Sequence, residues 1–119
     1  MASAFEPAVT IAQGNWLRLL KRGRWEYAQR TVGGAAAILI ALTENHEIVL
    51  IEQWRPAVCA RVIELPAGLI GDQVATENET PELAAARELE EETGFVAKQL
   101  ERVCEGFVSP GLSDEKMIV

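Results

Sequence analysis

The chain has 119 residues, of which 49% are hydrophobic and 24% are charged, with 11 basic and 18 acidic side chains. This length allows one folded core, and the net charge of −7 argues against a protein that binds nucleic acid or an anionic membrane. The two cysteines match neither a disulfide framework nor a zinc site, no secretory signal opens the sequence, and no apolar run is long enough to cross a bilayer. We therefore expect a cytoplasmic protein.

The first part of the chain, residues 1–32, alternates loosely between polar and apolar residues, with turn signals at Gly14–Asn15 and Gly23. This pattern predicts two or three short antiparallel strands. Residues 33–119 are predicted to form the main domain, so that residues 1–32 make a separate N-terminal segment.

Two apolar runs, Val32–Leu42 and Ile48–Ile51, open the main domain, and a polar turn at residues 43–47 separates them. Each run is too short for a core helix, so we predict two buried strands joined as a hairpin. His46 is the only histidine and lies on that turn. We interpret it as a solvated turn residue, because no other histidine or cysteine stands beside it to complete a metal site.

The next residues are punctuated by prolines and glycines. Pro56 should end a strand, and residues 61–65 alternate as a strand does until Pro66 stops it. Residues 71–79 are polar and predict a loop. Beyond the helix described next, residues 109–111 predict a turn, and residues 116–119 resemble the start of a strand.

One helix is strongly indicated, beginning after Thr80. Threonine is a good N-cap, Pro81 suits the first helical position, and Glu82 is favoured at the positive end of the helix dipole. Strong helix formers follow, and Gly94 can adopt the left-handed conformation that closes a helix.

Four glutamates occupy the end of this helix, where a carboxylate is unfavourable. The C-terminal end of a helix carries partial negative charge, so each carboxylate there costs about 0.3–1 kcal/mol. Glu88 and Glu92 also form a like-charge pair four residues apart. At 100° per residue, Glu88, Glu91 and Glu92 share one stripe of the helix, whereas Glu90 points away.

A solvated acidic helix end would explain an ordinary run of glutamates. Three carboxylates on one stripe at the unfavourable end are better explained by a divalent cation that normally lies against them. The candidate ligands are all oxygens, which favours Mg²⁺, or alternatively Mn²⁺, over Zn²⁺. Such a cation would also allow this acidic protein to bind an anionic substrate.

The spacing of these residues resembles a known signature. Glu79, seven further residues, and then Arg87-Glu88-Leu89-x-Glu91-Glu92-x-Gly94-Phe95 resemble the Nudix box. The glycine of that box is expected six residues before its first glutamate, where this chain has Gln73. Gly68 is the better counterpart, which implies about five extra residues in the loop 71–78.

Further segments are similar to the ADP-ribose pyrophosphatase branch of the Nudix hydrolases. They are Glu52–Pro56, Glu64–Ile70 and Pro110, together with Trp25, Glu26 and Arg30 in the segment that helps to hold adenine and builds a swapped dimer in this branch. The resemblance implies an α+β fold, an α/β/α sandwich around a mixed sheet. Members of the branch are longer, so we expect the C-terminal portion of the fold to be missing. Pairing with another copy or missing polypeptide would then cover the exposed sheet edge.

The resemblance also implies roles for individual residues. The catalytic residues would be Glu88, Glu91 and Glu92, and the metal ligands would be these three glutamates and the backbone carbonyl of Ala67. Arg87 would be structural, with Glu79 as its partner. The substrate would be bound by the following residues: Arg55 at a phosphate, Glu64 near a ribose, Trp16 and Trp25 stacked on a purine, Arg30 supporting the base, and Leu69.

Simpler explanations remain for several of these substrate-binding candidates. Arg55 could be an exposed arginine before a proline, and Glu64 could be a glutamate at the end of a strand with no function. Either tryptophan could belong to the core or to a dimer interface.

The implied activity is Mg²⁺-dependent hydrolysis of the diphosphate in ADP-ribose or a related nucleoside diphosphate sugar, by a homodimer. The products would be a nucleoside monophosphate and a sugar phosphate. The alternative is a non-catalytic Nudix-fold module that binds a nucleotide or has a regulatory role. The intact glutamates favour the enzyme, and the missing C-terminal portion favours the alternative.

Overall fold

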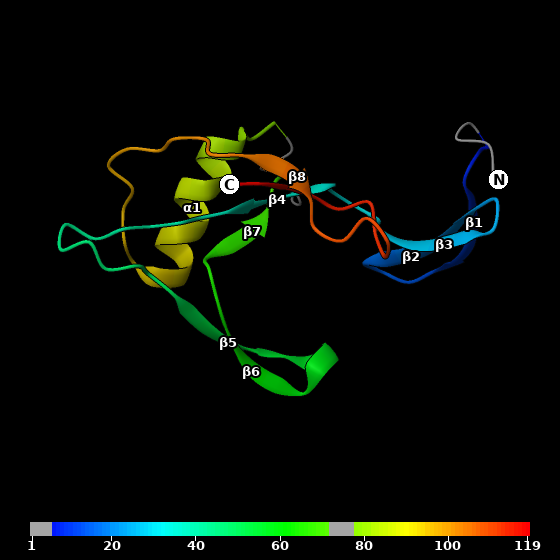
Figure 1. Cartoon of the computed structure of the whole chain (residues 1–119), viewed down its shortest axis with the longest axis horizontal. Helices are drawn as coiled ribbons and strands as arrows, with labels where there is room; N and C mark the ends of the chain where they lie inside the picture. The colour runs from blue at the N-terminus through cyan, green and yellow to red at the C-terminus, as the bar shows by residue number, and fades with distance from the viewer. Residues whose placement is uncertain (1–5, 72–77) are drawn as a thin grey trace.

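The structure is a computed structural model that describes residues 6–71 and 78–119. Figure 1 shows one helix against a sheet, a hairpin that projects from this body, and an N-terminal sheet at the far end of the molecule. The elements in chain order are β1 (Val9–Gln13), β2 (Leu17–Arg22), β3 (Trp25–Arg30), β4 (Ala35–Ile38), β5 (Ile51–Arg55), a 3₁₀ turn η1 (Pro56–Val58), β6 (Ala60–Glu64), β7 (Ala67–Leu69), α1 (Pro81–Thr93), β8 (Glu105–Phe107) and β9 (Lys116–Ile118).

The main sheet has the strand order β7-β4-β9-β8. Strands β4 and β9 are parallel and the other pairs are antiparallel, so the sheet is mixed. Helix α1 packs across β7 and β4, and the small core between them contains buried Ala36, Ala37, Leu39, Ala84 and Leu89. The α+β class with a mixed sheet is thus confirmed. Among the described residues α1 covers one face, and the second helical layer of the expected sandwich is not among them.

The N-terminal strands form a separate antiparallel sheet in the order β1-β2-β3, as the sequence predicted. It is joined to the main body through β3 and the residues that lead into β9. The Ala28 N–H donates to the Leu112 carbonyl at 2.8 Å, and Arg30 forms an ion pair with Glu115 at 2.8 Å. The predicted boundary between residues 32 and 33 stays a prediction.

The predicted hairpin between Val32–Leu42 and Ile48–Ile51 is confirmed only close to the turn, where Leu42 and Ile48 form an antiparallel bridge and the Val49 N–H donates to the Ala41 carbonyl at 2.9 Å. Further from the turn the prediction is wrong, because β4 pairs with β7 and β9. The reason is that β4 is a central strand, which has two partners, whereas the residues after the polar turn pair with β6. His46 is an exposed residue of that turn, as predicted.

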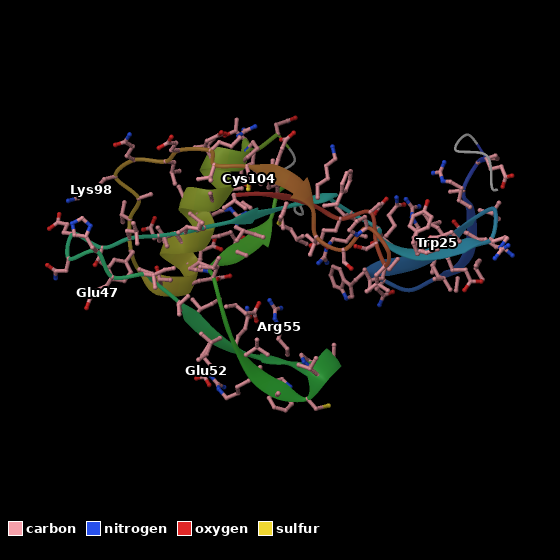
Figure 2. All side chains as sticks on the ribbon, in the orientation of Figure 1. Trp25, Glu47, Glu52, Arg55, Lys98 and Cys104 are labelled. Carbon is pink, nitrogen blue, oxygen red and sulfur yellow. The ribbon has the colours of Figure 1, made fainter. Side chains whose placement is uncertain are left out.

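Strands β5 and β6 form the projecting hairpin. Strand β5 ends at Arg55 because Pro56 opens the 3₁₀ turn that reverses the chain. Residues directly opposite each other in an antiparallel pair share a face. The pairing of Arg55 with Ala60 and of Ile51 with Glu64 therefore places Arg55 and Glu64 on the same face. Glu52 and Arg61 lie on the other face, and Figure 2 shows Arg55 and Glu52 on opposite sides of the hairpin.

The helix begins and ends as predicted. The Thr80 side chain accepts a hydrogen bond from the Leu83 N–H, and Pro81 occupies the first turn. Gly94 is left-handed, with φ of 76°, and its N–H donates to the Glu90 carbonyl. Strand β7 was not predicted, and most of the predicted loop 71–79 lies outside the described residues. No helix in the described part of the chain is long and apolar enough to cross a membrane.

Candidate active site

The helix and strand β7 meet at Gly68 and Glu88. A β-carbon at Gly68 would lie 1.9 Å from the Glu88 carboxyl carbon and 2.2 Å from its Oε1. Only glycine leaves room for Glu88 to lie flat on the strand, where its side chain is 14% exposed. This contact gives a physical reason for a glycine at position 68, the position that the sequence matched to the box glycine. Gln73, the regular position, lies outside the described residues.

Glu92 lies one turn further along the helix, beside the same strand. The pKa of its carboxyl is raised, first by partial burial and then by the negative charges of Glu88 and Glu64. A hydrogen bond from the Ala67 backbone and the positive charge of Arg55 both lower that pKa. These effects come from groups near Glu92, so five predicted site residues are neighbours: Arg55, Glu64, Ala67, Glu88 and Glu92.

Arg55 and Glu64 form a two-pronged ion pair beside the acidic cluster, which consists of Glu88 and Glu92. Arg55 donates from Nε to one Glu64 oxygen and from Nη2 to the other, both at 2.7 Å. The hydrogen bond to Glu64 raises the pKa of Arg55, and the same contact lowers the pKa of Glu64. The Gln53 side chain, on the same face of the hairpin, also lowers the pKa of Glu64. The sequence analysis missed Gln53, although alternation along β5 would have placed it on the face of Arg55.

Arg87 is the centre of a second polar network, on the helix itself. It donates to both Glu79 oxygens at 2.9 and 3.1 Å, to Glu88 at 2.8 Å and to Glu91 at 3.2 Å. Glu79 is the partner that the sequence predicted, and its side chain is only 10% exposed. The pairing with Glu79 is the largest cause of the raised pKa of Arg87. The arginine therefore joins the residues before the helix to its last turns.

The predicted metal ligands are only partly brought together. Glu88, Glu92 and Ala67 are neighbours, but the Glu91 side chain is 59% exposed and contacts Arg87. Within residues 6–71 and 78–119, no three side chains of His, Cys, Asp or Glu are close enough together to hold a metal ion. The predicted ligand set therefore stays a prediction.

The predicted nucleotide-binding residues are divided between two places. Leu69 is half-buried on β7, next to Gly68. Trp16, in the turn before β2 of the N-terminal sheet, and Trp25, on β3 of that sheet, are 78% and 60% exposed. Arg30 is in that sheet as well, paired with Glu115. Figure 2 shows Trp25 at the far end of the molecule from Arg55, so one chain does not bring Trp25 to the acidic cluster.

The acidic cluster is open to the surface. Two hollows of about 460 and 760 Å³ lie elsewhere, along residues 37–43 and 95–103, and none of Arg55, Glu64, Glu88 and Glu92 lines them. They are lined mainly by apolar side chains, which do not suit an anionic ligand, whereas the cluster offers charged side chains. We therefore base the candidate site on the cluster.

Comparison with known proteins shows the family and the fold. The NUDIX domain family matches residues 32–116. The ADP-ribose pyrophosphatase of Bacillus subtilis is 40% identical over 82 residues, and the ADP-sugar pyrophosphatase of Mus musculus is 36% identical over 124 aligned positions. These alignments cover 69% and 87% of this chain. A crystal structure of an ADP compounds hydrolase superposes with a TM-score of 0.72 at 22% identity, covering 94% of this chain, and so shows the same fold.

The chain is shorter than these proteins. It spans 41% of the Bacillus protein, 53% of the mouse protein and 62% of the chain in the solved structure.

Proposed function

The chain belongs to the NUDIX family, and on that premise we propose that it hydrolyses the diphosphate of ADP-ribose or a related nucleoside diphosphate sugar. The products would be a nucleoside monophosphate and a sugar phosphate. Activity would require Mg²⁺, which Mn²⁺ could replace. The similarity to an ADP-ribose pyrophosphatase and an ADP-sugar pyrophosphatase supports this choice of substrate.

One observation carries the proposal. The Glu88 carboxylate lies against Gly68, and the Glu92 carboxylate lies against Ala67 with the Arg55 guanidinium nearby. Carboxylates and one guanidinium thus share a surface between helix and strand. That combination suits a ligand that carries negative charge and is bound together with a cation.

The residues fit a hard divalent cation. The donor set is made only of oxygens, from Glu88, Glu92, Ala67 and, after rotation of its exposed side chain, Glu91. When bound, the cation would neutralise charge on the diphosphate and lower the pKa of a coordinated water. Arg55 would contact a phosphate group, and Glu64 would line the same subsite.

The nucleotide base would be bound by Trp16, Trp25 and Arg30. Because Trp25 lies at the far end of the molecule from Arg55, we propose a homodimer in which each copy supplies its N-terminal sheet to the other. Exposed tryptophan rings provide large flat surfaces that suit a purine. A cytoplasmic location, where thiols stay reduced, accords with the two free cysteines.

The test is turnover of ADP-ribose by the purified chain with Mg²⁺, followed by product analysis. Glu88→Gln and Glu92→Gln should each reduce the rate by orders of magnitude, and chelation should abolish it. Glu90→Gln is the matched control, since Glu90 is on the same helix turn but outside the cluster. Equal rates in the wild type and in both cluster variants would refute the proposal.

A binding module without catalysis is the second candidate. It is favoured by the contact of Glu91 with Arg87 and by the lack of a three-carboxylate group in the described part of the chain. Titration of ADP-ribose, followed by tryptophan fluorescence with and without Mg²⁺, separates the two. Saturable binding with no product formed would favour the module.

A further inference from the structure

The Arg55 guanidinium lies nearer to the base of the hairpin than the Arg55 backbone does. Arg55 is opposite Ala60 near the tip, whereas Glu64 is opposite Ile51 at the base. Four residues of strand separate the two positions, which corresponds to about 13 Å between their α-carbons. Nevertheless, two guanidinium nitrogens lie 2.7 Å from Glu64. The Arg55 side chain therefore extends back along the hairpin, toward the body of the molecule.

Glu64 is the more firmly held member of the pair. Its side chain is 25% exposed, against 49% for Arg55, and Gln53 lies on the same face of the hairpin. A half-exposed arginine without a partner would populate many rotamers, because its long side chain gains entropy in water. Glu64 supplies both acceptors that select one of them.

The pair leaves one edge of the guanidinium for a ligand. Nε and Nη2 are bonded to Glu64, and within the described residues Nη1 has no hydrogen-bond partner. The charge of Arg55 acts on Glu92, so the guanidinium lies on the side of the acidic cluster. A two-pronged contact fixes the plane of a guanidinium as well as its position.

We propose that Glu64 is a positioning residue that holds the Arg55 guanidinium beside the acidic end of α1, with Nη1 directed at an anionic phosphate of the substrate. Glu64 then acts on the substrate through Arg55 and does not contact the ribose. This inference rests on the proposed function, because it assumes that a phosphate ligand binds at the cluster.

The hairpin provides a matched control. Glu52 and Arg61 form an ion pair at 3.3 Å on the opposite face, with both side chains more than half exposed. Glu52→Gln removes the same charge from the same hairpin without affecting Arg55. Comparing it with Glu64→Gln therefore isolates the effect of the Arg55 contact.

The experiment is a double-mutant cycle on ADP-ribose hydrolysis with Mg²⁺, using Glu64→Gln, Arg55→Ala and the double variant. Glu64→Gln should raise KM roughly tenfold, because a charge-assisted contact is lost, and leave kcat nearly unchanged. In the Arg55→Ala background the same substitution should have no further effect, and Glu52→Gln should have none at all. Additive losses, or an equal loss in Glu52→Gln, would overturn the positioning role.

A second measurement needs no substrate. The Nε–H of Arg55, observed by ¹⁵N NMR, should exchange slowly with water in the wild type and in Glu52→Gln, and quickly in Glu64→Gln. Fast exchange in the wild type would contradict the positioning role directly. Slow exchange in a protein that neither binds nor hydrolyses ADP-ribose would refute the proposed function while leaving the Glu64–Arg55 contact established.

Discussion

Two regions of the molecule present functional side chains in opposite ways. One is the contact between α1 and β7, and the other is the N-terminal sheet. At the first, Glu88 fills the space left by a glycine and Arg87 is bonded to three carboxylates. On the second, Trp16 and Trp25 are mostly exposed, and the sheet is joined to the body at its third strand. The first region is organised within one chain, whereas the second presents Trp25 at the far end of the molecule from Arg55.

Charge separates the same two regions. Residues 1–32 contain five basic and two acidic side chains, whereas residues 33–119 contain six basic and sixteen acidic ones. The sheet that carries the tryptophans is therefore positive on a protein that is negative overall. Opposite charge favours an approach between the sheet of one copy and the acidic body of another. Substitutions in the α1–β7 region should therefore affect the isolated chain more than substitutions in the N-terminal sheet.

Gly68→Ala should disable the organised region. The added methyl group would displace the Glu88 carboxyl, so we expect hydrolysis to fall about 100-fold. The displaced atoms are the far end of a flexible side chain, so the free energy of unfolding should change by only ~1 kcal/mol. Rate assays and thermal unfolding measure the two effects. Gly34→Ala, where an added β-carbon meets nothing within 4 Å, is the control, and a similar loss in that variant would contradict the explanation.

Glu79→Gln should weaken the fold around α1. Glu79 accepts two hydrogen bonds from Arg87 and is nearly buried, so we expect the free energy of unfolding to fall by about 1–2 kcal/mol. Glu82→Gln breaks the exposed pair with Arg102 and should change the free energy of unfolding much less. Chemical denaturation of both variants measures the difference. Equal effects would mean that the Arg87 network is no more than a surface contact.

Thr80→Ala should separate the stability of the helix from its chemistry. Loss of the bond to the Leu83 N–H should lower the free energy of unfolding by ~1 kcal/mol. The rate per folded molecule should not change, since the cap is at the other end of α1 from Glu92. A large loss of rate at a temperature where the variant is fully folded would show that the two ends of the helix are coupled.

Replacing Trp16 and Trp25 together by alanine should have the smallest effect on the isolated chain. Both side chains are exposed, so in dilute solution the free energy of unfolding should stay within ~0.5 kcal/mol of the wild type. The denaturation midpoint is measured over a range of protein concentrations. A strong destabilisation at every concentration would mean that the rings are packed within one chain, which would contradict their exposure.

The sequence predicted the helix well, and it predicted that Glu88 and Glu92 share a stripe, because both depend on local signals. Thr80, Pro81 and Gly94 specify the ends of α1 through backbone chemistry within a few residues. The misplaced charges of Glu88 and Glu92 are visible from helix periodicity alone, and these two residues do lie together beside β7.

The sequence failed where pairing is distant. Strand β4 was assigned to a hairpin, but its neighbours are β7 and β9, about 30 and 80 residues away along the chain. The separation of the tryptophans from the cluster depends on the same long-range arrangement. The Arg55–Glu64 contact could not be predicted either, because it depends on a rotamer that a strand pattern does not specify.

The bridges that join the N-terminal sheet to the body also determine when that sheet can dock during synthesis. Gln29 is bonded to Asp114 and Arg30 to Glu115, each pair 85 positions apart. Strands β1 to β3 can pair as soon as they leave the ribosome, because their contacts are local. Their attachment must wait until Asp114 and Glu115 have emerged, and contacts at such separation form slowly. The strands of this sheet can thus pair well before the sheet reaches its final place.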